Sequence, residues 1–436
     1  LLPPSLTGLP PDLWGGSEVG DLVQLMRTQP VQGLPAILDF TEMLALAELS
    51  APSDAPVGGA ELFLARLDLL LARGALEPAQ ALIERAGPTD PAVFRRWFDV
   101  SLLTGRPDRA CAAMAANPDI APTFPARIFC LARGGDWSAA ALSLGTAEAL
   151  GQITTEEADL LARFLDPELF EGEPPLPPDP SLTPLEYQMR VALAERPDAT
   201  DLPLAFVHAD LPVQAGWRAQ LDAAERLTRS GAIEPQEWLS IYTARAPSAS
   251  GAVWDRVGAL QAFDAAILAA DPAEVSTRLA PAWTAMQQAG LEVAFADIYA
   301  ERLLRLPLTG QAGMLARRVG LLSPLYEQVA QRAVPQDATE RFAFAIARGL
   351  PAEAPLSGGM AARAVADAFA ETRPAHRYQP YLDNGQLGEA LLRAAQVLAQ
   401  GTGDANDLTD ALVLFRDVGL ESTARRAALQ LLLLQG

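Results

Sequence analysis

The chain has 436 residues, of which half are apolar and only 6% are aromatic, and its formal charge is −21. A surface this acidic repels phosphate backbones and anionic lipids, so we expect no nucleic acid and no membrane surface as a general partner. All 33 basic residues are arginine, because the sequence contains no lysine, and this excludes both a Schiff-base lysine and the lysine of a P-loop.

The apolar share comes mostly from alanine and leucine, which are strong helix formers. β-branched residues are sparse and rarely alternate with polar ones, so a large sheet is not expected. The composition therefore predicts an all-α fold.

Residues 1–16 are rich in proline and glycine and predict an extended arm. This stretch lacks the basic start and the unbroken apolar run of a signal peptide. We expect that a signal peptide has been removed before Leu1 and that the protein is periplasmic, with a cytoplasmic protein of trimmed start as the alternative. No stretch approaches the ~18 consecutive apolar residues that a membrane span needs.

Residues 17–165 contain the strongest pattern, a run of helical hairpins. In "LARGALEPAQALIERAGPTDP", which begins at residue 71, Gly74 marks a turn because glycine adopts the left-handed conformation at no steric cost. Ala79, five residues later, is small enough to let the second helix approach the first. Two further turns share this spacing, at Gly105 with Ala110 and at Gly134 with Ala139.

Four residues of the first hairpin resemble the tetratricopeptide repeat. In that family glycine is followed by alanine five residues later, alanine twelve later and proline seventeen later, as in Gly74, Ala79, Ala86 and Pro91. The second unit has Asn117 in the third place, and the large–Leu–Gly sequence of the family's first helix is missing. The resemblance implies stacked helix pairs whose concave surface binds a peptide or a partner protein.

Three more segments follow. Residues 166–183 predict a Pro-rich acidic linker, residues 184–349 a central helical domain and residues 350–436 C-terminal helical hairpins. The glycine–alanine spacing recurs at Gly385 and Gly419, where an alanine-rich sequence also produces it by chance. The predicted fold is all-α, with helical-hairpin repeats stacked into a curved α-solenoid in two or three segments.

The two cysteines, Cys111 and Cys130, allow two interpretations. In an exported protein they can form a disulfide, which stabilises the fold by about 3 kcal/mol for a loop of this size. Otherwise they are two small buried apolar side chains.

Residues typical of catalysis and of metal binding are scarce. The two histidines, His208 and His376, lie in unrelated segments, and neither has a cysteine or a second histidine at metal-ligand spacing. No HExxH, Gly-x-Ser-x-Gly, dinucleotide or P-loop motif occurs. We therefore predict no catalytic, metal-binding or cofactor-binding residue, and no cofactor.

These observations favour a non-enzymatic scaffold or adaptor that binds one or more protein partners within a larger complex. Six of the seven tryptophans lie in amphipathic segments, where core packing is the first expectation for each. The alternative for one or two of them is to line a concave groove, where aromatic residues and arginine dominate binding energy. In its length and in its helical, alanine- and leucine-rich composition, the chain is similar to periplasmic proteins of alphaproteobacterial flagellar motors. The alternatives are a secretion or assembly chaperone and an enzyme acting on cell-wall material, since lytic transglycosylases have a similar alanine-rich helical ring.

Overall fold

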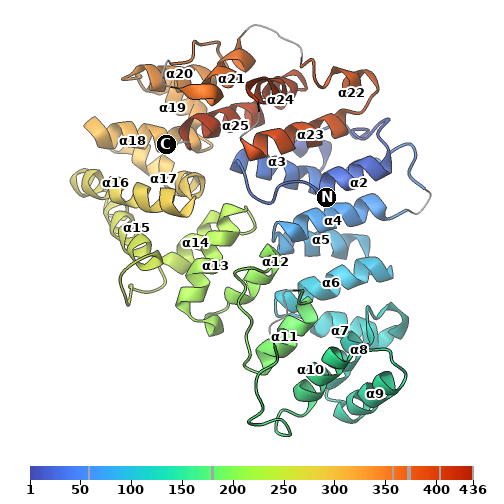
Figure 1. The fold of residues 1–436 in the computed structure, drawn as a ribbon. Coiled ribbons are helices and arrows are strands. Elements are labelled where there is room, and N and C mark those ends of the chain that lie inside the picture. Colours follow the sequence, from blue (N-terminus) through green and yellow to red (C-terminus); the bar gives the residue numbers. More distant parts are fainter. Residues whose placement is uncertain (57–58, 178–180, 356–357, 371–374, 402–403, 435–436) are drawn as a thin grey trace. The chain divides into compact units, whose positions relative to one another are not determined.

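The computed structural model describes residues 1–56, 59–177, 181–355, 358–370, 375–401 and 404–434. In these ranges the fold contains 25 α-helices and no β-strand, so the predicted all-α helical-repeat fold is confirmed (Figure 1). Residues 178–180 of the expected linker and 356–357 of the C-terminal segment lie outside the described residues. None of the described helices combines the length and the apolar character needed to cross a bilayer.

The helices pack into two compact units. Leu1–Leu69 and Gly216–Gly436 together make one unit, here called the terminal unit because it contains both ends of the chain. Leu70–Ala215 makes the other, here called the inserted unit. The five segments expected from the sequence follow changes in composition instead of contacts, and they stay a prediction.

The N-terminal part of the terminal unit contains α1 (Pro4–Thr7), α2 (Val19–Arg27) and α3 (Pro35–Leu46), and α4 (Glu61–Ala72) includes the boundary. The inserted unit continues with α5 (Leu76–Ala86), α6 (Pro91–Leu103), α7 (Asp108–Ala116), α8 (Phe124–Arg133), α9 (Trp137–Ala149), α10 (Thr155–Leu165), α11 (Pro184–Ala192) and α12 (Leu204–Val207).

The rest of the terminal unit is also helical. It contains α13 (Trp217–Arg229), α14 (Pro235–Tyr242), α15 (Val253–Leu268), α16 (Pro272–Ala289), α17 (Glu292–Arg305), α18 (Gly310–Leu322), α19 (Tyr326–Arg332), α20 (Ala338–Ala347), α21 (Gly359–Phe369), α22 (Gln379–Asp383), α23 (Leu387–Gln400), α24 (Ala405–Asp417) and α25 (Glu421–Leu433).

The hairpin turns of the inserted unit share one backbone geometry. Gly74 and Gly105 have φ angles of 76° and 70°, in the left-handed region. The N–H of the residue after each glycine donates to a carbonyl five residues earlier, at 2.9 Å from Ala75 to Leu70 and 2.7 Å from Arg106 to Ser101. This is the hydrogen bond that closes a helix end with a left-handed glycine.

The third turn lies one residue later than the sequence pattern indicates. Gly134 has a φ of −73°, and it is Gly135 that adopts the left-handed conformation, with φ of 86°. Ala140, five residues after Gly135, is fully buried, as are Ala79 and Ala110, whereas Ala139 is only half-buried. The equivalent pair is therefore Gly135 with Ala140, and the adjacent Gly-Gly and Ala-Ala sequences explain the shift.

The C-terminal glycine–alanine pairs have the same geometry. Gly385 and Gly419 are left-handed, and the alanine five residues after each, Ala390 and Ala424, is fully buried. The spacing that chance alone explains in an alanine-rich sequence thus marks two real helix turns. The reason is physical: the second helix of each turn approaches its neighbour at this residue, where only a small side chain fits.

A disulfide joins Cys111 of α7 to Cys130 of α8, with the two Cα atoms 5.1 Å apart. We expect the double substitution Cys111→Ser with Cys130→Ser to lower the free energy of unfolding by about 3 kcal/mol, because the unfolded chain regains the entropy of the open loop. Urea denaturation measures this loss. A reductant should reproduce it in the wild type and leave the variant unchanged; equal stability of all samples would show that the bridge does not form.

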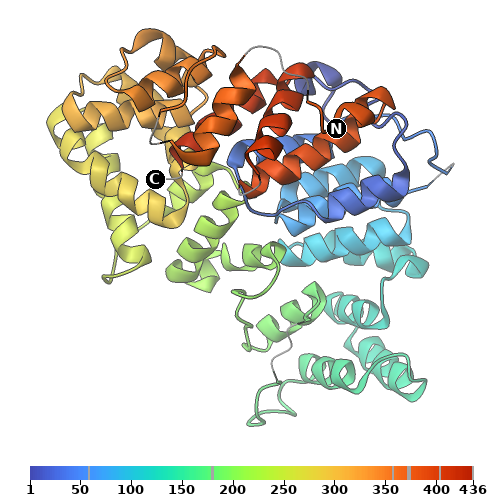
Figure 2. The ribbon, with the colours of Figure 1, turned by 45° about the horizontal axis from the view of Figure 1, so that its top comes forward.

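Helices from opposite ends of the chain pack together in the terminal unit. Helix α3 contacts both α23 and α25, and α2 contacts α23 (Figures 1 and 2). Their buried side chains belong to one apolar core, in which Phe40 meets Phe415 edge to face at 4.8 Å between ring centroids. The N-terminal helices are thus held by the last hairpins, although the inserted unit and α13 to α22 lie between them in the sequence.

The expected N-terminal arm contains the short helix α1 and lies against the start of α23. Trp14 is buried in the core cluster, and the carbonyl of Leu13 accepts a hydrogen bond from the N–H of Gly388 at 2.9 Å. Gly388 has no room for a side chain, because a Cβ there would come within 2.4 Å of the Trp14 ring. The arm is therefore an integral part of this unit.

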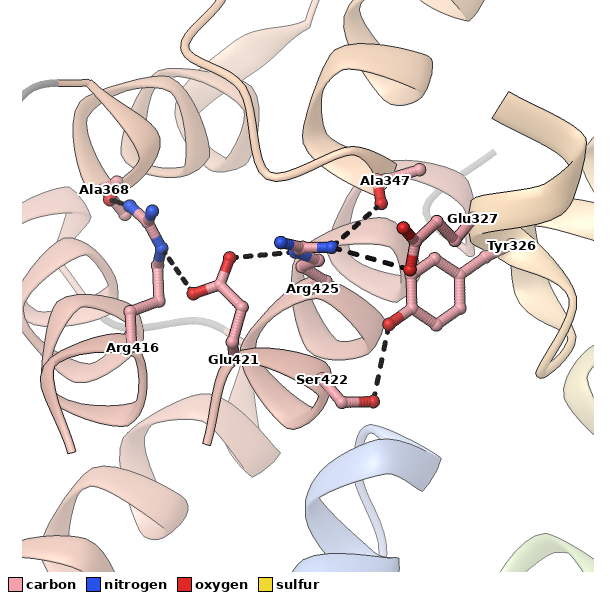
Figure 3. A network of polar contacts seen from close by, with 8 residues as sticks. All are labelled: Tyr326, Glu327, Ala347, Ala368, Arg416, Glu421, Ser422 and Arg425. Carbon is pink, nitrogen blue, oxygen red and sulfur yellow. Dashed lines mark hydrogen bonds and ion pairs between the residues drawn. The ribbon is translucent and has the colours of Figure 1, made fainter. Parts of the chain in front are cut away.

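A network of polar contacts joins the start of α25 to its neighbours (Figure 3). The Glu421 carboxylate accepts hydrogen bonds from Arg416 at 3.0 Å and from Arg425 at 2.8 Å. Arg416 also donates to the carbonyl of Ala368 at the end of α21, at 2.6 Å. These charge-assisted bonds fix α24, α25 and α21 in one register, because a guanidinium presents its donors in a rigid plane.

Candidate functional site

The inserted unit contains a cavity of about 650 Å³ lined largely by apolar side chains. We call it the aromatic groove. It lies among six helices, and its lining includes Leu102 of α6, Asp108 of α7, Phe129 and Arg133 of α8, Trp137 of α9, Phe164 of α10 and Val191 of α11.

Stacked rings build one part of the aromatic groove. Phe129 and Phe164 lie nearly parallel, with ring centroids 5.5 Å apart, and they hold α8 against α10. Gln188 of α11 donates to the carbonyl of Leu102 at 2.9 Å and so places α11 beside the end of α6. The groove is thereby built from helices that packing and hydrogen bonds already fix, which lowers the entropic cost of binding.

Trp137 is the exposed member of the aromatic groove. It is the first residue of α9, whose N-terminus is capped by the Asp136 carboxylate accepting from the N–H of Ala139. Its side chain is 51% exposed, although a tryptophan in a soluble protein is usually well buried. Of the tryptophans that the sequence marks as groove candidates, Trp137 lies in the aromatic groove, whereas Trp97, Trp217, Trp238 and Trp283 are buried.

The charges at the aromatic groove balance. Asp108 and Arg133 form an exposed ion pair, with 2.5 Å between Oδ1 and Nε. Beyond the groove, Leu142 of α9 is 74% exposed, and Leu150, the residue after the end of α9, is 67% exposed. A helix with apolar residues on every side normally lies inside a protein. The groove and α9 together thus offer exposed apolar side chains beside one balanced ion pair, in a protein of strongly negative charge.

A second cavity, of about 360 Å³, lies in the terminal unit, and we call it the acidic cleft. One wall is a single face of α3, formed by residues that recur at helical spacing from Pro35 to Leu46. The other wall comes from the end of α13, the residues before α14 and the start of α17. Four of its lining residues carry carboxylates: Asp39, Glu42, Glu234 and Asp297.

The carboxylates of the acidic cleft differ in their surroundings. Asp39 forms an ion pair with Arg426 of α25, at 2.7 Å. The pKa of Asp297 is raised to about 6, chiefly by burial; the positive charge of Arg426 lowers it, and the negative charges of Asp39 and Glu234 raise it. Asp297 therefore gains a proton between pH 7 and pH 5, and in its ionised form it attracts cations.

A carboxyl group with a raised pKa can serve in proton donation or in cation binding. Proton donation by a carboxyl pair needs two groups in unlike environments flanking one bond. In the acidic cleft Asp39 is held by Arg426, whereas the Asp297 and Glu234 carboxylates have no hydrogen bond or ion pair among the described residues. This arrangement fits a cation held between carboxylates better than a catalytic pair.

The two histidines belong to different units. His208 is largely buried and its Nε2 lies 2.6 Å from the carbonyl of Gly74, while burial lowers its pKa, so it holds the turn as a neutral donor. His376 is exposed on the segment before α22. Among the described residues no three histidine, cysteine or acidic side chains are grouped so that they could hold a metal ion.

Comparison of the chain with protein-family models, with curated proteins and with solved structures found no match. The resemblance of the hairpins to the tetratricopeptide repeat stays a prediction.

Proposed function

We propose that the protein is a non-enzymatic scaffold that holds a partner protein in the aromatic groove. The observation that carries this proposal is the half-exposed Trp137 beside the stacked rings of Phe129 and Phe164. Tryptophan and arginine are the residues that most often dominate binding energy at protein interfaces, and Arg133 lies in the same groove. Helical-hairpin arrays commonly bind peptides and proteins in this way.

The partner segment should be apolar or aromatic and carry little charge. The charges of Asp108 and Arg133 balance each other in the groove, so a strongly basic segment finds no unpaired negative charge there to bind. The exposed Leu142 of α9, and Leu150 just after this helix, extend the apolar area that such a segment can cover. An amphipathic helix of the partner, with its apolar face in the groove, matches this surface.

The disulfide between Cys111 and Cys130 supports an oxidising compartment, because disulfides are rare in the reducing cytosol. We therefore propose that the scaffold acts in the periplasm, within an envelope assembly such as the flagellar motor. Labelling of free thiols in protein taken from its native cells tests this placement. Unlabelled cysteines support the periplasm, and complete labelling without prior reduction contradicts it.

The substitution Trp137→Ala tests the aromatic groove. We expect the variant to fold, because half of the side chain is already exposed, and to bind the partner at least about tenfold more weakly, as removal of a central anchor usually does. Leu268→Ala on α15, which removes a side chain of similar exposure from the terminal unit, is the matched control.

The partner is found by mild crosslinking in the native cells and mass spectrometry of the proteins captured with the tagged wild type. The proposal predicts a stoichiometric protein that the control variant also captures and that the Trp137 variant loses. Equal capture by the wild type, the Trp137 variant and the control variant would show that the partner binds outside the groove. A monomer that captures nothing would contradict the scaffold.

A further inference from the structure

We propose that a third cavity, in the terminal unit, binds a small organic carboxylate through the guanidinium of Arg66. The cavity has a volume of about 150 Å³ and lies between the N-terminal arm, the residues after α3 and the first turns of α4. We call it the arginine pocket. Its lining includes Trp14, Leu49, Pro52, Leu62, Phe63 and Arg66.

Arg66 is a buried cation without a counterion. It is only 9% exposed, and no carboxylate pairs with it among the described residues. An arginine is almost never buried to this degree unless it is paired. Arg256 and Arg317 are also largely buried, and each of them forms an ion pair with a glutamate. Because a buried charge without a counterion is costly, the missing negative charge points to a ligand.

The guanidinium of Arg66 has donors left for this ligand. Its Nε donates to the carbonyl of Ala45 and its Nη2 to that of Ala47, each at 2.7 Å. These carbonyls lie at the end of α3 and carry only partial negative charges, so they orient the guanidinium without neutralising it. Nη1 has no hydrogen-bond partner in the described part of the chain, and protein atoms do not enclose it. Nη1 is therefore free to donate to an anion in the arginine pocket.

Two further features favour an anion at this place. The first residues of α4 line the arginine pocket, and the N-terminus of a helix carries the positive end of its dipole. Burial lowers the pKa of Arg66 to about 10, and no neighbouring carboxylate opposes this shift, so the group is still charged at pH 7. A bound carboxylate stabilises the charged form and should raise this pKa again.

The walls of the arginine pocket select an organic anion over a bare one. Trp14 is fully buried, and Leu49 and Leu62 are half-buried beside it. A cavity of this volume can hold a ring of about the size of benzene. A carboxylate bound to Nη1, with its apolar group against these walls, matches both parts of the lining. Such a carboxylate belongs either to a small free acid or to the C-terminus of a peptide.

Glu61 is the one acid that lines the arginine pocket among the described residues. Its side chain is exposed and forms no ion pair with Arg66. The variant Glu61→Gln removes a negative charge near the site, so it should bind the ligand about two- to fivefold more tightly. If Glu61 were instead the internal counterion of Arg66, the variant would be less stable and would bind no better, and this result would overturn the proposal.

Isothermal titration calorimetry with benzoate tests the site. The wild type should bind benzoate at least about tenfold more tightly than the neutral benzamide, and than acetate, which lacks the ring. Arg66→Gln should lose at least about tenfold in affinity for benzoate. The matched control Arg278→Gln, which removes an exposed arginine of α16, should change this affinity less than about twofold. Trp137→Ala should also leave it unchanged, since Trp137 belongs to the inserted unit.

Hydrogen–deuterium exchange of the wild type places the ligand even if Arg66→Gln does not fold. Saturating benzoate should slow amide exchange in residues 61–66 of α4 and leave α8 and α9 unchanged. Three results would contradict the proposal: equal binding of benzoate and benzamide, equal binding of benzoate by the wild type and a folded Arg66→Gln, and protection confined to other helices. Equal affinity for acetate and benzoate would reduce the site to one for bare anions.

A second titration identifies the source of the carboxylate. If the tripeptide glycyl-glycyl-phenylalanine binds at least about tenfold more tightly than benzoate, the ligand is the C-terminus of a peptide, whose backbone adds contacts. If the tripeptide binds more weakly, the ligand is a small free acid. Amidation of the tripeptide's C-terminus should weaken its binding in either case, because the amide lacks the negative charge; an unchanged affinity would contradict the contact with Arg66.

Discussion

Replacing Trp14 with alanine should lower the free energy of unfolding of the terminal unit by about 3–5 kcal/mol, as loss of a fully buried aromatic side chain usually does. Trp14 lies in the core that joins α2 and α3 to the C-terminal hairpins. The large cost is expected because the cavity cannot collapse: the Leu13 carbonyl remains bonded to Gly388 and holds the arm in place. Chemical denaturation followed by circular dichroism measures this loss.

A pair of glycine substitutions tests the same contact from the other side. Gly388→Ala places a Cβ within 2.4 Å of the Trp14 ring and should cost about 1–3 kcal/mol. Gly20→Ala in α2 meets nothing within 4 Å and should stabilise its helix by up to about 1 kcal/mol. If both substitutions were neutral, or if Trp14→Ala cost less than about 1 kcal/mol, the arm would not be part of the folded core.

Replacing Arg256 with leucine should cost about 3–5 kcal/mol, because it leaves a buried carboxylate without its counterion. Arg256 of α15 donates two hydrogen bonds to Glu225 of α13, at 2.8 Å from Nε and 2.7 Å from Nη2. Glu225 is buried and also accepts a hydrogen bond from the Tyr242 hydroxyl of α14. Three helices therefore meet at one carboxylate.

A double-mutant cycle, made of Glu225→Leu, Arg256→Leu and the double variant, separates the ion pair from the packing around it. The double variant Glu225→Leu with Arg256→Leu should be more stable than Arg256→Leu alone, since no unpaired charge remains buried. Arg278→Leu on α16 removes an exposed partner of Glu274 and should change stability by less than about 1 kcal/mol. Equal costs for Arg256→Leu and Arg278→Leu would show that the buried network adds nothing beyond a surface pair.

The helical hairpins could be predicted from the sequence because the turn signal is local. A left-handed glycine and a buried alanine five residues later are set by a single helix end, so their spacing is visible in the chain. The same locality explains the error at the third turn. Gly134 and Gly135 are adjacent, either glycine can adopt the left-handed conformation, and only the packing of the two helices determines which one does. It also explains why Gly385 and Gly419 could not be distinguished from chance.

The two cavities depend on contacts between distant segments and could not be predicted in this way. Trp137 was visible as an aromatic candidate, but Phe129 and Phe164 meet only in the folded unit. Asp297 is one acid among 54 aspartates and glutamates, and its pKa is raised by burial and by groups from other helices. The sequence did contain one signal of the acidic cleft. Asp39 and Glu42 lie on the same face of α3 as Leu38 and Met43, whereas a helix face that packs in the core is apolar throughout.

The most direct test of the scaffold is hydrogen–deuterium exchange of the protein with and without the captured partner. If the partner lies in the aromatic groove, amide exchange should slow in α8, α9, α10 and α11 on binding, and the Trp137→Ala variant should lose this protection. Protection confined to the other helices would contradict binding in the groove, and unchanged exchange throughout would contradict a stable complex.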